Sequence, residues 1–123
     1  MSDQTEKLLD SFRDAKKRHA KAHSEAAFLE HYRKVVLARA MKAAHEFGFV
    51  TVASQDREAH ASDEYLAHIK GLKEANEQAR LWEAEAREAE LAIEIWRTEQ
   101  ASERLERKAY NVGPSYDPGQ LVG

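Results

Sequence analysis

The chain has no cysteine, only two prolines and only five glycines among its 123 residues. Without cysteine it can form neither a disulfide nor a thiolate metal site, which is typical of cytosolic proteins. The shortage of proline and glycine, together with 33% charged residues, favours helices, because Ala, Glu, Lys, Arg and Leu lose least on entering one. No apolar run is long enough for a membrane span, and the opening MSDQTEKLLD is too polar for a signal peptide. We therefore expect an all-α, cytoplasmic protein with no membrane contact.

The first part of the chain contains a helical repeat. Apolar and small residues recur there at alternating steps of three and four, the spacing of a helix that packs lengthwise on another helix. Gly48 follows the repeat and can adopt the left-handed conformation that ends helices. A helix is therefore predicted over about residues 3–47. The repeat consists of Leu8, Phe12, Ala15, Ala22, Ala26, Leu29, Val36, Ala40, Ala43 and Phe47, with His19 and Arg33 as interruptions.

Residues 48–62 are predicted to be a connector. Within it, Ser54 is expected to cap a short helical turn through Ala59. Ser62, followed by Asp63 and Glu64, has the pattern of an N-cap with acids in the first turn, where they favour the helix dipole. A second long helix is therefore predicted to begin at residue 63.

Helical spacing from Tyr65 to Trp96 extends this second helix to about residue 110. Gly71 in its interior costs roughly 1 kcal/mol and predicts a bend or a close helix contact. Residues 111–123 contain both prolines and three of the five glycines, so they are predicted to form a flexible tail. The predicted fold of residues 1–110 is an antiparallel helical hairpin with a short connector.

The predicted hairpin has too little core to bury its large side chains. Two helices of about 45 residues would be roughly 65–70 Å long at 1.5 Å per residue. Their facing surfaces are largely alanine, so the aromatic and aliphatic side chains need a further surface, and we expect a homo-oligomer. The residues predicted to form the subunit interface are Phe12, Phe28, Leu29, Tyr32, Val36, Trp82, Ile93 and Trp96.

The sequence contains no pattern of catalytic residues. His19 and His23 have a spacing that can present two imidazoles to a metal, but no third ligand lies nearby, which favours solvated surface histidines. There is no glycine-rich phosphate loop and no suggestive order of nucleophile, histidine and acid. We therefore expect no enzymatic activity, no metal and no cofactor.

Charge is distributed unevenly along the chain. Residues 1–47 carry 10 Lys and Arg against 7 Asp and Glu, whereas residues 63–110 carry 8 against 12. The basic run RDAKKRHAKAH suits a phosphate backbone, although an ordinary solvated helix face has the same composition. The acidic run EAEAREAE, residues 83–90, suits a solvated face, and a DNA-mimicking or protein-docking surface is the alternative. The residues predicted to bind nucleic acid are Arg13, Lys16, Lys17, Lys21, Arg33 and Lys34.

Two stretches, SQDREAHASDEY (Ser54–Tyr65) and ELAIEIWRTEQASERLERKAY (Glu90–Tyr110), resemble a family of small helical proteins encoded by tailed bacteriophages and prophages. Genes for such proteins often lie near recombination and single-strand-binding genes. The layout, with a long helix, a polar connector and a Trp-bearing second helix, is similar to that of UvsY-type recombination mediators. Those are ring-forming helical proteins that bind single-stranded DNA and help to load a recombinase.

The resemblance implies a phage recombination or replication accessory protein in the cytoplasm of a bacterial host. Its implied partners are other copies of itself, single-stranded DNA, a single-strand-binding protein or a recombinase. An alternative is a protein-binding adaptor or inhibitor of a host protein with no nucleic-acid contact, using the acidic run or the tail. A third is a purely structural coiled coil.

Overall fold

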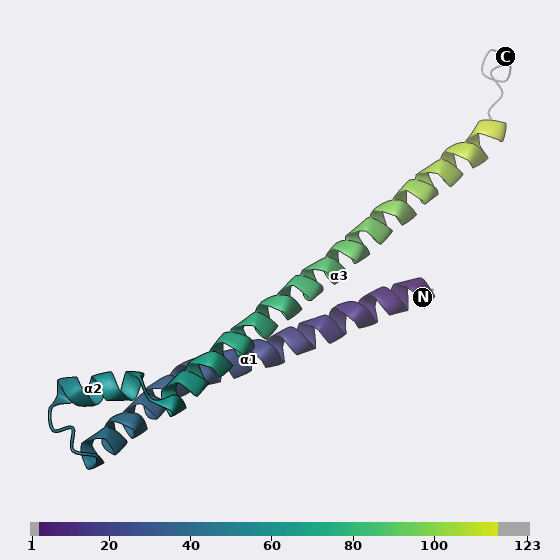
Figure 1. Ribbon diagram of the computed structural model, residues 1–123. Helices are drawn as coiled ribbons and strands as arrows, with labels where there is room; N and C mark the ends of the chain where they lie inside the picture. The colour runs from purple at the N-terminus through teal and green to yellow at the C-terminus, as the bar shows by residue number, and fades with distance from the viewer. Residues whose placement is uncertain (1–2, 116–123) are drawn as a thin grey trace.

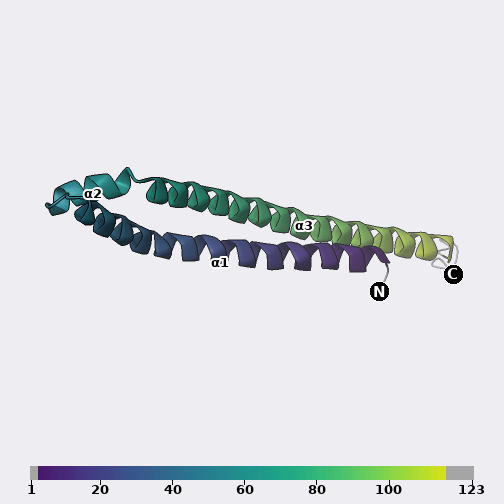
Figure 2. The same ribbon diagram turned by 60° about the horizontal axis from the view of Figure 1, so that its bottom comes forward.

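The computed structural model describes residues 3–115, with side chains as far as residue 110. It contains α1 (Asp3–Glu46), α2 (Val52–His60) and α3 (Asp63–Ser115). Figures 1 and 2 show α1 and α3 side by side and antiparallel, with α2 at the closed end of the hairpin. The described residues include no strand, and the predicted all-α hairpin is confirmed at this level.

The two long helices meet along an inner seam, in which positions on each helix follow alternating steps of three and four. All of these positions are buried or half-buried, including the two that interrupted the apolar repeat, His19 and Arg33. Alanine dominates the buried residues, which explains why the core is thin. The inner seam consists of Thr5, Leu8, Phe12, Ala15, His19, Ala22, Ala26, Leu29, Arg33, Val36 and Ala40 on α1, and Tyr65, His68, Leu72, Ala75, Ala79, Trp82, Ala86, Ala89, Ile93, Trp96 and Gln100 on α3.

The end of α1 confirms the predicted role of Gly48. Its φ of 104° lies in the left-handed region, where glycine has no steric penalty. The Gly48 N–H donates to the carbonyl of His45 (3.0 Å), and the Phe49 N–H donates to the carbonyl of Ala44 (3.1 Å). This is the Schellman pattern of helix termination, and it satisfies carbonyls that the helix itself leaves free.

The connector contains more helix than the sequence predicted. Thr51, and not Ser54, caps α2: the Thr51 Oγ1 accepts a hydrogen bond from the Ser54 N–H at 3.1 Å. The prediction for Ser54 is wrong because an equally good capping side chain lies three residues earlier, on extended backbone. Ser62, by contrast, caps α3 as predicted, and its Oγ accepts from the Tyr65 N–H at 3.2 Å.

Gly71 is not a point of close helix approach, which corrects one of the two roles predicted for it. A Cβ built at this position would meet nothing within 4 Å. The residue instead lines an open groove between α1 and α3.

The third helix is also longer than predicted, because it ends at Ser115 and not near Tyr110. Asn111 and Val112 do not end a helix by themselves, so the Gly113–Pro114 pair falls within the last turn. The rest of the predicted tail, residues 116–123, lies outside the described residues. Figures 1 and 2 show α3 continuing well past the start of α1. Residues 101–110, here called the α3 extension, are all exposed.

None of the helices in the described part of the chain is both long enough and apolar enough to cross a membrane.

Candidate interaction surfaces

Four of the six residues predicted to bind nucleic acid share one side of α1. Arg13, Lys17 and Lys21 follow one another at steps of four residues, and Lys34 lies on the same outward half of the helix. All four are exposed and occupy positions away from the inner seam. We call these four residues the basic ridge.

The other two predicted residues lie elsewhere. Lys16 is on a flank of α1, with its Nζ 5.9 Å from the centre of the Phe12 ring. Arg33 belongs to the inner seam, and its guanidinium lies 3.2 Å from the carboxylate of Glu30. The six residues therefore do not form one surface, because consecutive helical positions are rotated by about 100° from each other.

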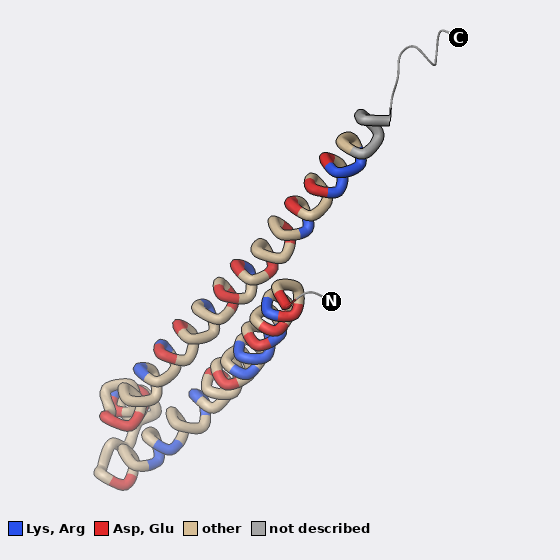
Figure 3. The backbone as a smooth tube through the Cα atoms, turned by 90° about the vertical axis from the view of Figure 1, so that its right-hand side faces the viewer, with Lys and Arg blue, Asp and Glu red and all other residues tan. Residues whose placement is uncertain are grey.

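The basic ridge is not neutralised by α3. Every ion pair among residues 3–110 joins two residues of the same helix, three or four positions apart. Arg13 has such a partner in Asp10 at 4.0 Å, but Lys17, Lys21 and Lys34 have none among the described side chains. Figure 3 shows the basic residues of α1 gathered in two groups, while both signs alternate along α3. The charge of Lys17, Lys21 and Lys34 is thus directed at solvent.

Most residues predicted to join subunits are instead packed within the chain. Val36 is only 4% exposed. Trp82 is half-buried, and the Arg18 guanidinium lies 4.8 Å from the centre of its ring. Phe28 is the exception, because it is 61% exposed and stacks on Tyr32 with ring centres 5.6 Å apart. Six of the eight lie in the inner seam, namely Phe12, Leu29, Val36, Trp82, Ile93 and Trp96.

A second seam on α3 was missed at the sequence level. It repeats the spacing of the inner seam on the opposite side of the helix, and all of its members are exposed. Its four large aliphatics are between 50% and 68% exposed. This outer seam consists of Leu81, Ala84, Glu88, Leu91, Ile95, Thr98, Ser102, Leu105 and Ala109.

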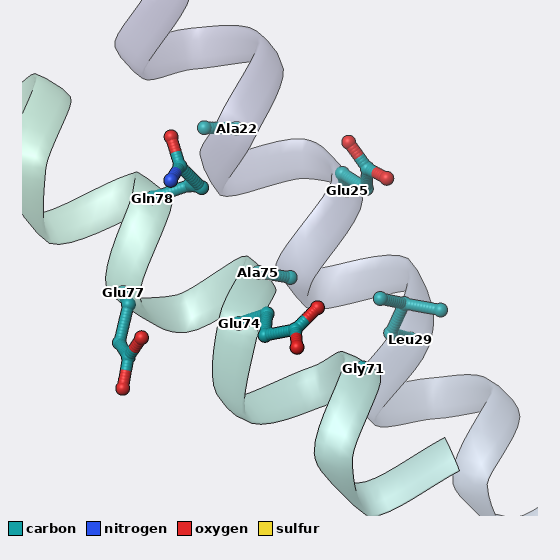
Figure 4. A pocket seen from close by; sticks show the side chains of 8 residues that line it. All are labelled: Ala22, Glu25, Leu29, Gly71, Glu74, Ala75, Glu77 and Gln78. Carbon is teal, nitrogen blue, oxygen red and sulfur yellow. The ribbon is translucent and has the colours of Figure 1, made fainter. Parts of the chain in front are cut away.

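An open groove with a volume of about 490 Å³ runs between α1 and α3 on one side of the hairpin. Its floor is made of small residues, and Figure 4 shows Gln78 of α3 directed toward Ala22 of α1. Farther along, a second hollow borders Trp82. Carboxylates predominate along the walls of these two hollows, which we call the acidic groove, and Arg18 and Lys21 line a third hollow between them. Its acidic residues are Asp14, Glu25, Glu74, Glu77, Glu85 and Glu88, two of which come from the acidic run of the sequence.

The closed end of the hairpin exposes a smaller apolar patch. Phe47 is 86% exposed, Val50 80% and Val52 73%. Phe47 and Val50 flank the Schellman turn, and Val52 begins α2. The path of the chain at the turn therefore leaves these three side chains in solvent.

The described residues contain no set of side chains placed to bind a metal ion. The rings of His19 and His23 are 6.0 Å apart, but no group of three or more His, Asp or Glu side chains among residues 3–110 could hold an ion.

Comparison of the chain with models of protein families, with curated proteins and with solved structures finds no match. The function is therefore inferred from the basic ridge and the other surfaces of the hairpin.

Proposed function

We propose that this chain is a non-catalytic accessory protein of a phage recombination or replication module, which binds single-stranded DNA as an oligomer in the manner of a mediator. The observation that carries the proposal is the basic ridge. Three of its lysines, Lys17, Lys21 and Lys34, face solvent and have no carboxylate partner among the described side chains. Lysines in this state can release counterions from phosphates without first breaking an ion pair.

The spacing along the ridge also suits a single strand. A step of four residues advances about 6 Å along a helix, which is comparable with the distance between phosphates in an extended strand. Arg13, Lys17 and Lys21 can therefore follow successive phosphates of one strand.

An aromatic pair, the exposed Phe28 and the half-buried Tyr32, lies close to the ridge. Phe28 follows Lys21 by seven residues, which is two helical turns, so both lie on the same side of α1. The Phe28 ring is 61% exposed and stacks on Tyr32. Aromatic side chains beside a basic track are the usual means of binding unpaired bases without sequence preference.

A pair of charge reversals tests this proposal. Lys17→Glu with Lys21→Glu is expected to weaken binding of a single-stranded oligonucleotide at least about tenfold, because two phosphate contacts become repulsive. Lys70→Glu with Lys73→Glu makes the same change in net charge on α3 and is the matched control. Equal losses in the two variants would mean that only the overall charge matters, and the assignment to the basic ridge would be wrong.

The acidic groove supports a second candidate function, that of an adaptor or inhibitor that binds a basic helix of a host protein. Six carboxylates line two hollows between α1 and α3, which are separated by a hollow lined by Arg18 and Lys21, and a third helix fits between two paired helices. In a pull-down from host lysate, Glu74→Lys with Glu85→Lys would then remove one stoichiometric partner. The Lys70→Glu, Lys73→Glu variant, which changes α3 outside the groove, would retain that partner. Recovery of recombination proteins alone would count against the adaptor.

A further inference from the structure

A hollow at the closed end of the hairpin lies outside both the basic ridge and the acidic groove. It has a volume of about 440 Å³ and is bordered by the end of α1, the end of α2 and the start of α3. Two buried alanines, Ala40 and Ala44, and the exposed rings of Phe47 and Phe49 line it. A concave, mostly apolar surface of this size with few polar groups is the usual form of a binding site. We call it the closed-end hollow.

The ionisable side chains that line the closed-end hollow are both acidic. Glu58 comes from α2 and Glu64 from the first turn of α3. Both are exposed, and neither belongs to an ion pair among residues 3–110. Their surroundings are also acidic, because residues 42–64 carry five Asp and Glu against two Lys and Arg. The occupant that complements this hollow has an apolar side chain with positive charges beside it.

The α3 extension presents this combination on one side of its helix. A set of four residues there follows the spacing i, i+3, i+4 and i+7, which places them on one face and is the spacing by which helices bind in apolar grooves. All four are exposed, and the side chain of Leu105 is 68% exposed. This docking stripe consists of Ala101, Arg104, Leu105 and Lys108.

The negative charges of the extension are on the other side of the helix. A rotation of about 100° per residue places Glu103 and Glu106 on the half opposite the docking stripe. Glu103 is paired there with Arg107 at 3.6 Å. Arg104 and Lys108, by contrast, have no ion pair among residues 3–110. The docking stripe therefore carries a leucine and two free positive charges, which complement the apolar lining and the two free carboxylates of the closed-end hollow.

The extension cannot reach the closed-end hollow of its own chain. Continuous helix joins Glu64 to Leu105, and it is about 60 Å long at 1.5 Å per residue. Figures 1 and 2 show the end of α3 far from α2, at opposite ends of the hairpin. The two complementary surfaces can therefore meet only between different copies of the chain.

We infer that the docking stripe of one copy binds in the closed-end hollow of another. Leu105 enters the apolar part of the hollow, and Arg104 and Lys108 lie beside Glu58 and Glu64. Because the stripe and the hollow are different surfaces, the contact is heterologous and can repeat from copy to copy. The inference supplies the self-association that the proposed function assumes. Sedimentation tests it, whereas oligonucleotide binding tests DNA contact, so the failure of one is distinguishable from failure of the other.

Charge reversal on each surface tests the contact by sedimentation of the full chain. The native chain is expected to exceed the 14.0 kDa mass of a single copy as its concentration rises. A hollow variant, Glu58→Arg with Glu64→Arg, and a stripe variant, Arg104→Glu with Lys108→Glu, should each raise the dissociation constant roughly tenfold or more, because like charges then meet. An equimolar mixture of the two variants should associate again, since every surface then finds one of opposite charge.

The control makes the same change in net charge as the stripe variant but outside both surfaces. Arg80→Glu with Arg87→Glu reverses two exposed arginines of α3 and should associate as the native chain does. A native chain that stays monomeric at high concentration overturns the inference. So does a mixture of the hollow and stripe variants that fails to associate, or an equal loss in the control.

Cross-linking identifies the two surfaces without altering their charges. The chain has no cysteine of its own, so Ala43→Cys places one thiol at the edge of the closed-end hollow and Ala101→Cys places one in the docking stripe. A mixture of the two variants, treated with a short thiol-specific cross-linker, should give a dimer that contains one copy of each. Ala101→Cys alone should give none, because two stripes do not meet. Absence of the mixed dimer would mean that something other than a second copy fills the hollow, and the inference would be wrong.

Discussion

The imidazole of His68 on α3 reaches across the inner seam to the main chain of α1, where its Nε2 lies 2.8 Å from the carbonyl oxygen of Leu29. A carbonyl only accepts hydrogen bonds, so Nε2 carries the proton in this contact. The ring also lies 6.1 Å from that of Tyr32. The His68–Leu29 contact joins α1 to α3 through a side chain and the main chain, and a polar contact in such a seam fixes the register of two helices.

Loss of the His68 contact should weaken the hairpin. His68→Ala removes the hydrogen bond and part of the packing on Tyr32, and we expect it to lower the free energy of unfolding by about 1–3 kcal/mol. Urea denaturation followed by circular dichroism measures the change. His31→Ala removes an exposed histidine from α1 and should cost no more than about 0.5 kcal/mol. Equal stability of the two variants would show that the cross-helix bond is not stabilising.

Gly48 and Gly71 should respond in opposite directions to alanine. Gly48 has a φ of 104°, so Gly48→Ala forces a side chain into the left-handed region and should destabilise the protein by about 1–2 kcal/mol. Gly71 is in the interior of α3 with open space around it. Gly71→Ala should therefore stabilise by roughly 0.5–1 kcal/mol, because alanine has the higher helix propensity. Thermal unfolding of both variants measures the two changes in stability. A destabilised Gly71→Ala would indicate that something occupies the space beside residue 71.

If Phe28 stacks on bases, its removal should weaken DNA binding without altering the fold. Phe28→Ala is expected to cost about 1–3 kcal/mol of binding free energy for a single-stranded oligonucleotide. Phe47→Ala is the matched control, since it removes an equally large exposed ring at the closed end of the hairpin. Isothermal titration calorimetry compares them. A greater loss from Phe47→Ala would relocate the aromatic contact to the closed end.

The features that the sequence predicted well are those that local rules determine. Gly48 ends α1 because few other residues tolerate its φ, and Ser62 begins α3 because its hydroxyl satisfies a free N–H. The inner seam followed from its regular spacing as far as Ala40, whereas Ala43 and Phe47, the last two members of the predicted repeat, are exposed and Ala44 is buried instead. The start of α2 was missed because Thr51 and Ser54 are both capable caps, and only the backbone angles distinguish them.

The candidate surfaces were harder to assign from the sequence for a different reason. A stripe at helical spacing packs equally well within a chain and between chains, so the sequence could not show that Val36 and Trp82 are used in the inner seam. The outer seam has the same spacing as the inner seam. Spacing alone does not show which of the two sides of α3 faces α1. Arg33 was grouped with Lys34 because both add to the basic character of the first helix, although adjacent helical residues point in different directions.

Salt dependence of DNA binding tests the proposed function most directly. Fluorescence anisotropy of a labelled single-stranded oligonucleotide, titrated with the full chain at several salt concentrations, gives the slope of the logarithm of the binding constant against the logarithm of salt. Each neutralised phosphate on a single strand contributes a slope of about −0.7, so the four residues of the basic ridge predict a slope of about −3. No binding even at low salt, or binding that does not respond to salt, would contradict the account and leave the acidic groove as the surface to pursue.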